Sequence, residues 1–329
     1  MGETVAVSPQ HGPVGGGAFC FLYEFGSCKV ALAVPGYTVY ERLGLGARSS
    51  IWLVASQATG EQFALKRVLR RTGEDDKFIK QAINDFEVSS RVSHPVLRRS
   101  YEMWRVSRFL VLRELRILME FVPGRTLEEV RPQKLDTLLR VFTRVAEGLD
   151  ALHQQNHVHT DVKPNNILIT ESEDVKVIDF GQSCPIGHVK GRIQGTPDYI
   201  APEQVEKGVP LTQRTDVFNL GATLYWAVTG RAYPTVMPSR KRRGGIDLVG
   251  PREAPPPEEV NPNVPTALSR LIMDCCRENP KDRPADMQEV IRRLEVAQHI
   301  LDKNGTTLIG GATEGDPSSV PTSPAPPSE

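Results

Sequence analysis

The sequence has few cysteines, no excess of charge of either sign and no long apolar run, and each absence excludes a class of protein. Its five cysteines form no CxxC pair and no metal-ligand spacing, which indicates reduced thiols instead of a disulfide framework. Formal net charge is zero, so no bulk electrostatic signal favours nucleic acid or an anionic membrane. No segment approaches the ~20 uninterrupted apolar residues of a membrane-spanning helix. We therefore expect a cytoplasmic protein with no membrane anchor and no nucleic-acid partner.

The composition changes along the 329 residues, which are enough for about two domains of ~150 residues. Residues 1–36 are rich in glycine, and we expect an N-terminal extension outside the core fold. Residues 303–329 are rich in proline and serine and cannot bury a core, so they predict a disordered tail. The insert at 238–265 carries a basic run at 240–243, and a solvated loop is expected there in preference to a partner-binding patch.

Hydrophobic periodicity predicts an α+β protein with two lobes. Alternating apolar residues predict strands early in the chain, and apolar residues at helical spacing dominate later. The expected β-rich lobe covers residues 37–122, a short joint lies at 120–125, and the expected helical lobe covers 123–302. The expected strands are 37–44, 50–56, 62–69, 101–112 and 114–122, and the expected helices are 76–92, 135–152, 213–229, 265–277 and 287–301.

Two polar segments near the middle of the chain carry the chemistry. The first runs from His159 to Asn166 as HTDVKPNN, and Asp179-Phe180-Gly181 follows 18 residues after Asp161. Asp161 could accept a hydroxyl proton, and Lys163 could neutralise charge on a moving phosphoryl group. Asn166 and Asp179 offer the oxygen ligands that Mg²⁺ prefers. This set predicts phosphoryl transfer from ATP.

Upstream segments suit the nucleotide. Gly44-x-Gly46 turns between the first two expected strands, where backbone N–H groups could face phosphates, although an ordinary hairpin turn explains the pair equally well. Lys66 ends Phe63-Ala64-Leu65-Lys66, an apolar strand in which a lysine is unusual. We expect its ammonium to bridge the α- and β-phosphates, the alternative being an edge lysine that reaches solvent.

That lysine needs a carboxylate, and the expected helix at 76–92 offers two. If Asp85 points inward, Val88 and Val92 share its face, whereas the companions of Glu87 would be polar. We therefore expect Asp85 to pair with Lys66, with Glu87 as the alternative. At the joint, the backbone C=O of Glu120 and N–H of Val122 would face an adenine edge.

Together these motifs resemble the eukaryotic-type Ser/Thr protein kinases over residues ~37–302. Further matches lie downstream in Ala201-Pro202-Glu203, in Asp216–Gly221 and in Asn279–Pro284, whose Arg283 would pair with Glu203. The resemblance implies a two-lobed protein kinase fold that binds ATP and Mg²⁺ in the cleft and acts on protein substrates at Ser or Thr hydroxyls. It implies that Thr196 bonds to Asp161 and Lys163, and that the nucleotide pocket includes Ile51, Ala64, Met119 and Leu168.

Three residues depart from the family pattern: Ser49 for a glycine, Asp85 for a glutamate and Thr160 for an arginine. They keep open a pseudokinase scaffold as the alternative to an active enzyme; a small-molecule phosphotransferase is a third reading. In most members the arginine before the base binds a phosphate on the activation segment, and a threonine cannot. We predict activity that does not depend on phosphorylation between residues 182 and 195, where Ser183 is the only hydroxyl residue.

Overall fold

A computed structural model describes residues 32–109, 111–235 and 254–304. The chain divides into two units after Pro35, and the description below concerns the unit that begins at Gly36. The predictions for residues 1–31, for the basic run 240–243 and for the tail beyond residue 304 lie outside the described residues.

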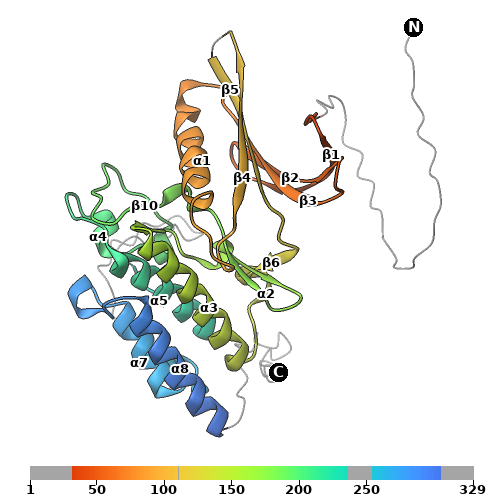
Figure 1. Cartoon of the computed structure of the whole chain (residues 1–329). Helices are drawn as coiled ribbons and strands as arrows, with labels where there is room; N and C mark the ends of the chain where they lie inside the picture. Colours follow the sequence, from red (N-terminus) through yellow and green to blue (C-terminus); the bar gives the residue numbers. More distant parts are fainter. Residues whose placement is uncertain (1–31, 110, 236–253, 305–329) are drawn as a thin grey trace, which may run out of the picture. The chain divides into compact units, whose positions relative to one another are not determined.

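The first part of this unit is a five-stranded antiparallel sheet covered by one long helix (Figure 1). Apolar side chains of the sheet, such as Ala64, Val68 and Ile117, pack on Ile79 and Ala82 of the helix and form a separate small core. The strand order is β1-β2-β3-β5-β4, with bounds β1 Tyr37–Leu45, β2 Ser49–Ser56, β3 Gln62–Leu69, β4 Ser100–Arg108 and β5 Val111–Glu120. The helix is α1, Asp76–Ser89, preceded by a 3-10 turn, η1, at Gly73–Asp75.

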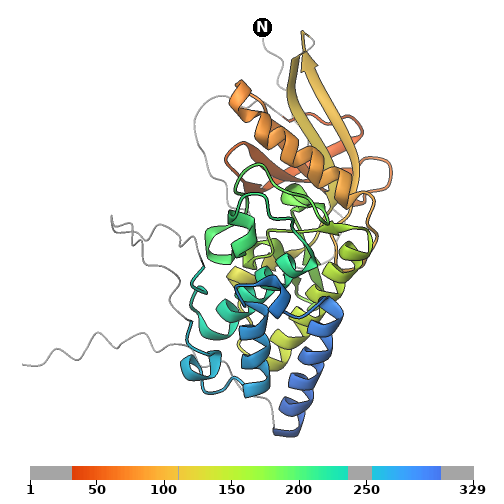
Figure 2. The same ribbon diagram turned by 90° about the vertical axis from the view of Figure 1, so that its left-hand side faces the viewer.

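The second part is helical and contains the larger core. α5 is buried along almost its whole length, and it packs against α3 and α7. α7 and α8 lie side by side at the end away from the sheet (Figure 2). The helices are α2 Leu127–Val130, α3 Leu135–Gln154, α4 Pro202–Val205, α5 Gln213–Thr229, α6 Pro257–Val260, α7 Thr266–Cys275 and α8 Met287–Asn304, and short 3-10 turns are η2 Pro164–Asn166, η3 Phe180–Gln182, η4 Pro197–Tyr199 and η5 Pro280–Asp282.

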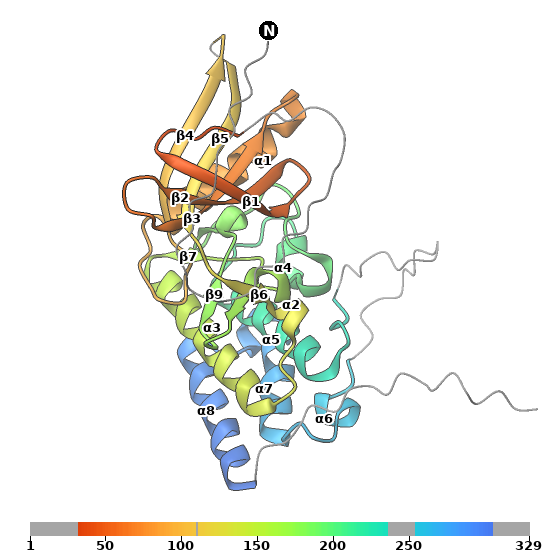
Figure 3. The same cartoon turned by 90° about the vertical axis from the view of Figure 1, so that its right-hand side faces the viewer.

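Short strands lie between the five-stranded sheet and the helices (Figure 3). β6 (Gly124–Thr126), β8 (Ile167–Thr170) and β9 (Val175–Val177) form one sheet, and β7 (His157–Val158) pairs with β10 (Cys184–Pro185). Gly124 must lack a side chain because a Cβ there would lie 2.6 Å from the carbonyl oxygen of Ile169. These strands carry the loops that hold the candidate catalytic groups.

The α+β, two-lobed architecture predicted from the sequence is confirmed. The helix predicted at 213–229 has those bounds in the structure, and the first three strands agree within one residue. β4 ends at Arg108 and β5 begins at Val111, whereas the predicted boundary between these two strands is near 113. No helix in the described ranges combines the length and apolar character needed to cross a bilayer.

The expected solvated loop before α7 is partly wrong. Ala254 and Val264 are buried, and Asn261 donates a hydrogen bond of 2.9 Å from Nδ2 to the carbonyl of Val228 at the end of α5. The short helix α6 lies between these contacts. The described end of this insert is therefore part of the helical core, because its apolar residues cover α5.

Candidate active site

A buried carboxylate on α5 shapes the loop that carries Asp161. Asp216 has no exposed surface and accepts hydrogen bonds from the backbone N–H groups of His159 (2.8 Å) and Thr160 (2.7 Å). Oδ2, the oxygen that accepts from His159, also lies 2.8 Å from Nε2 of His153. These donors outweigh the effect of burial and lower the pKa of Asp216, so it stays ionised. The helix predicted to brace the catalytic loop does so through this side chain and through Thr223, whose hydroxyl donates to the carbonyl of Val162 at 3.2 Å.

Asp161, Lys163 and Thr196 form a closed triangle of hydrogen bonds. The ammonium of Lys163 donates to Oδ2 of Asp161 at 2.8 Å and to Oγ1 of Thr196 at 2.7 Å. The Thr196 hydroxyl donates to Oδ1 of Asp161 at 2.8 Å. The contacts expected for Thr196 are therefore present. Asp161 is 4% exposed, so a proton acceptor of fixed orientation lies just below the surface.

The predicted metal ligands are Asn166, which is bonded to Asp161, and Asp179, which lies near Lys66. The amide nitrogen of Asn166 donates to the carbonyl of Asp161 at 2.9 Å, which leaves its side-chain oxygen as the atom available to a cation. The Asp179 carboxylate is about half exposed and lies 3.7 Å from the ammonium of Lys66. Among the described residues no trio of His, Cys, Asp or Glu could hold a metal ion. A pair of hard oxygen ligands suits Mg²⁺, which keeps several waters and also binds substrate phosphates.

Asp179 also has an unusual backbone conformation. Its φ is +66°, in the left-handed region that non-glycine residues seldom adopt, and Thr160 shares this feature at +63°. Strained residues of this kind persist only where surrounding contacts fix them, and they concentrate at functional sites.

The sheet-rich lobe supplies a charged network. Lys66 donates to Oδ2 of Asp85 at 2.8 Å, so Asp85 and not Glu87 is the partner. Arg98 donates from the same Nη2 atom to both oxygens of Asp85, at 3.1 and 3.2 Å. The backbone N–H of Phe180 adds a fourth contact at 3.0 Å. The fully buried carboxylate of Asp85 thus joins α1 to strand β3, to Arg98 just before β4 and to the Asp179-Phe180 segment.

Burial and pairing oppose each other in this network, and pairing prevails. Burial alone would lower the pKa of Lys66, but the negative charges of Asp85 and Asp179 raise it above its ordinary value. Burial alone would raise the pKa of Asp85, but the charges of Lys66 and Arg98 hold it well below its usual range. Lys66 is therefore a cation and Asp85 an anion at neutral pH.

Arg98 and Asn84 are the contributors that sequence reasoning missed. Asn84 on α1 donates from Nδ2 to the carbonyls of Phe180 (3.0 Å), Gly181 (3.3 Å) and Ser183 (2.8 Å). It fastens the helix to the segment that follows Asp179. Neither residue belongs to a spaced motif, so only the folded chain reveals them.

A cleft of about 1160 Å³ runs between the sheet and the helical lobe in front of the joint. Five of the predicted nucleotide-binding residues line it: Ile51, Ala64, Glu120, Val122 and Leu168. Arg98 lines it too and connects it to the charged network around Asp85. The predicted residues outside the lining are Gly44, Gly46, Lys66, Met119 and Asp179.

Two of those predicted residues have clear structural reasons for their position. Met119 is 1% exposed and packs in the small core of the sheet with Ala64. Gly46 donates its N–H to the carbonyl of Ser49 at 2.7 Å, and a Cβ on it would lie 2.7 Å from Oγ of Ser49. The glycine turn therefore closes on itself, and Gly46 would have to release this bond to give its N–H to a phosphate.

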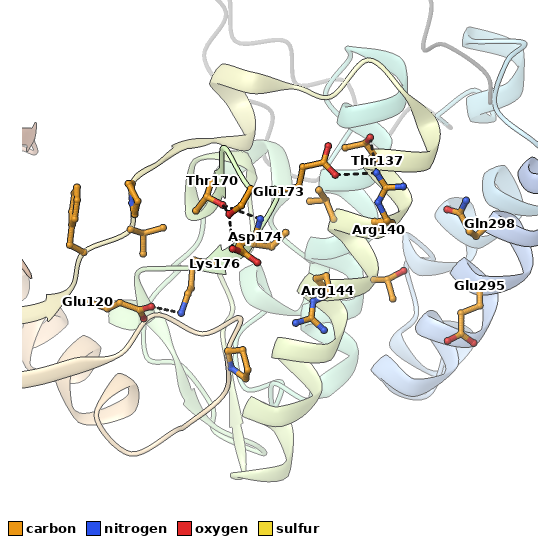
Figure 4. Close-up of a pocket in the computed structure, with 18 of the residues that line it drawn as sticks. Glu120, Thr137, Arg140, Arg144, Thr170, Glu173, Asp174, Lys176, Glu295 and Gln298 are labelled. Carbon is orange, nitrogen blue, oxygen red and sulfur yellow. Dashed lines mark hydrogen bonds and ion pairs between the residues drawn. The ribbon is translucent and has the colours of Figure 1, made fainter. Parts of the chain in front are cut away.

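A second pocket, of about 850 Å³, is shown in Figure 4, and it shares the joint residues 120–123 with the cleft. Two ion pairs lie within the pocket: Lys176 contacts Glu120, and Arg140 contacts Glu173 at 3.1 Å. None of Asp161 and its hydrogen-bonding partners lines it. It is lined by Glu120 and Val122, two of the predicted nucleotide-binding residues, so it adjoins the candidate nucleotide site.

The predicted Glu203–Arg283 pair is present deep in the helical lobe. The guanidinium binds both carboxylate oxygens, at 2.8 and 2.9 Å, and stacks 4.9 Å from the ring of Phe218. It also donates to the backbone carbonyls of Arg214 and Glu278. This pair anchors the segment that follows Thr196 to the core.

Comparison with known proteins agrees with this geometry. A family model for the protein kinase domain matches residues 37–295. A probable serine/threonine-protein kinase of Clostridium acetobutylicum is 25% identical over 268 residues, which are 78% of this chain and 39% of that protein. Another from Clostridium perfringens is 35% identical over 190 residues, 54% of this chain and 27% of that protein. The kinase PrkC of Bacillus subtilis is 26% identical over 282 residues, 82% of this chain and 42% of that protein. The chain spans less than half the length of these three relatives.

Proposed function

Since this chain belongs to the protein kinase family, we propose that it transfers the γ-phosphoryl group of ATP to serine or threonine hydroxyls of proteins. The observation that carries this proposal is the hydrogen-bonded triangle of Asp161, Lys163 and Thr196. It combines a proton acceptor, a cation for the phosphoryl group and a hydroxyl that orients both. The Ser/Thr class rests on Lys163, on Thr196 and on the relatives, which are named serine/threonine-protein kinases.

In this mechanism Asp161 orients the acceptor hydroxyl and takes its proton. Lys163 stays at Asp161 and stabilises negative charge on the transferred group. Lys66, held by Asp85, binds the α- and β-phosphates, and the backbone of Glu120 and Val122 holds the adenine edge. Mg²⁺, held by Asn166 and Asp179, would neutralise phosphate oxygens.

The three departures from the family pattern leave in place every group to which the mechanism above assigns a role. Asp85 is one methylene shorter than a glutamate, yet it lies within 2.8 Å of Lys66. Lys66, Asp161, Asn166 and Asp179 are all present. This supports catalysis over a pseudokinase scaffold.

The cysteines support a cytoplasmic setting. Cys184, Cys275 and Cys276 are free and buried, as in proteins kept reduced. We extend the proposal to a cytoplasmic enzyme on this ground.

The test is transfer of labelled phosphate from Mg-ATP to a generic basic protein, followed by acid hydrolysis to identify the labelled amino acid. Labelled phosphoserine or phosphothreonine is expected with wild type and not with Asp161→Asn. Labelled phosphotyrosine alone would overturn the substrate class. Nucleotide binding without any transfer would establish the pseudokinase alternative.

A further inference from the structure

Lys190, in the segment between Asp179 and Thr196, reaches back to the loop that carries Asp161. Its ammonium donates to Oγ1 of Thr160 at 2.7 Å and to the carbonyl of Gln182 at 2.9 Å. The Thr160 hydroxyl itself donates to the same carbonyl at 2.9 Å. The Lys190 ammonium, the Thr160 hydroxyl and the Gln182 carbonyl are therefore all bonded to one another. In most family members this position of the catalytic loop has an arginine, which binds a phosphate on the activation segment.

Thr160 is fixed on every side. It is fully buried, and a β-branched residue at a φ of +63° is strained. Its N–H donates to Asp216 at 2.7 Å, and its carbonyl accepts from Nε2 of Gln204 at 2.8 Å. With the hydroxyl bound to Gln182 and Lys190, all its polar atoms are used. Such contacts hold a strained residue in place and make its hydroxyl a rigid acceptor.

The ammonium of Lys190 is placed at a cost. Neither atom that accepts from it carries a charge, and burial lowers the pKa of Lys190 below its ordinary value. Removing a cation from water without a contacting anion is unfavourable. A lysine that only needed solubility would extend outward, so its inward position requires a structural role.

The set is linked to Thr196 by a short path. Nε2 of Gln204 donates to the carbonyl of Thr160 and also, at 3.1 Å, to the carbonyl of Gln194. Lys190 is thus bonded to Thr160 directly, and Gln194 is linked to Thr160 through Gln204. Thr196, two residues after Gln194, completes the triangle with Asp161.

Ser183 is poorly placed to take over this role by phosphorylation. Its side chain is buried, with an Oγ that has no hydrogen-bond partner. Its carbonyl is held by Asn84 at 2.8 Å. A kinase would have to pull this residue out of the core to modify it.

We propose that Lys190 is a positioning residue that fixes the activation segment against Thr160, so that the peptide platform forms without a phosphate. The proposal rests on the function proposed above and adds how its site is kept in the active arrangement. The cation lies on the segment and the acceptor lies on the catalytic loop, the reverse of an arginine that binds a phosphate.

The first test compares Lys190→Met with Lys207→Met, a matched change at an exposed lysine nearby. For Lys190→Met we expect kcat/KM for a basic protein acceptor to fall roughly 10-fold or more, with KM for ATP nearly unchanged. Amide hydrogen exchange across residues 182–195 should become faster, whereas a peptide from α5 should exchange as in wild type. Lys207→Met should match wild type in both measurements.

The second test reverses the charges. Thr160→Arg places a guanidinium beside Lys190 and should lower acceptor kcat/KM roughly 10-fold or more through repulsion. Adding Lys190→Glu should restore most of that loss, because the pair is then Arg–Glu. A double variant no better than Thr160→Arg overturns the proposal, and so does a Lys190→Met protein that equals wild type in rate and exchange.

The two proposals fail separately. A wild type that transfers no phosphate overturns the proposed function. The hydrogen-exchange comparison then still decides whether Lys190 holds the segment, because it needs no activity.

Discussion

Two fully buried carboxylates, Asp85 in the sheet-rich lobe and Asp216 in the helical lobe, are held in opposite ways. Two cations, Lys66 and Arg98, neutralise Asp85. Asp216 relies on two backbone N–H groups and on His153. The site can therefore respond to a ligand at Asp85 and not at Asp216: Lys66 would also bind a nucleotide, whereas every hydrogen-bonding partner of Asp216 is internal.

The largest effect is expected at Asp85. Asp85→Ala leaves two cations without their buried partner and should lower the free energy of unfolding by roughly 3–5 kcal/mol. Urea denaturation measures it. The matched control is Glu87→Ala on the same helix, which is exposed and should cost under about 0.5 kcal/mol. Equal losses in the two variants would mean that the Lys66–Asp85–Arg98 network is not what stabilises this lobe.

Asp216→Asn should cost less, because no buried cation loses its only partner. The asparagine amide keeps one oxygen acceptor, but its NH₂ group replaces the other carboxylate oxygen and faces a backbone N–H that needs an acceptor. We expect a loss of roughly 1.5–3 kcal/mol, the value of hydrogen bonds to a charged group. The same urea series measures it. A loss larger than that of Asp85→Ala would reverse the comparison.

Arg98→Met should have a smaller effect still. Asp85 retains Lys66 and the N–H of Phe180, and a buried guanidinium with an unpaired Nε is removed. We expect a loss of about 1 kcal/mol, since desolvation offsets part of the pairing. Arg99→Met, at the exposed neighbouring position, is the control. If Arg98→Met proved as costly as Asp85→Ala, then Arg98 and not Lys66 would be the main partner.

Lowering the pH should reduce the difference in free energy of unfolding between wild type and Asp85→Ala. The folded-state pKa of Asp85 is depressed, so its contribution is present above the unfolded value of about 3.9 and is lost as pH falls toward the folded pKa. Between pH 7 and pH 3 the gap in unfolding free energy should shrink by about 1 kcal/mol. A gap that widens in acid would show that Asp85 is protonated in the folded protein.

Sequence reasoning predicted the fold, which the structure confirms, and proposed a candidate site, because both rest on local patterns. Alternating apolar residues located the strands, and apolar residues at helical spacing located α3 and α5. Asp85 shares a helix face with Val88 and Val92, and this identified it as the partner of Lys66. The family resemblance implied the contact between Asp161 and Thr196, which lie 35 residues apart, and the structure contains it.

What remained hidden depends on the folded chain alone. Arg98 reaches Asp85 across 13 residues and Lys190 reaches Thr160 across 30, and neither belongs to a periodic pattern. Met119 turns into the small core because the sheet and α1 enclose it. Sequence gives the residue type at such positions, but only packing decides which neighbour the side chain meets.

The most direct test of the central claim is the ratio of initial phosphoryl-transfer rates for wild type and Asp161→Asn at saturating Mg-ATP and acceptor. Asparagine preserves the size of the side chain while removing the proton acceptor. We expect a ratio of roughly 10²–10⁴, the contribution of a general base. Equal rates for the two proteins would contradict it.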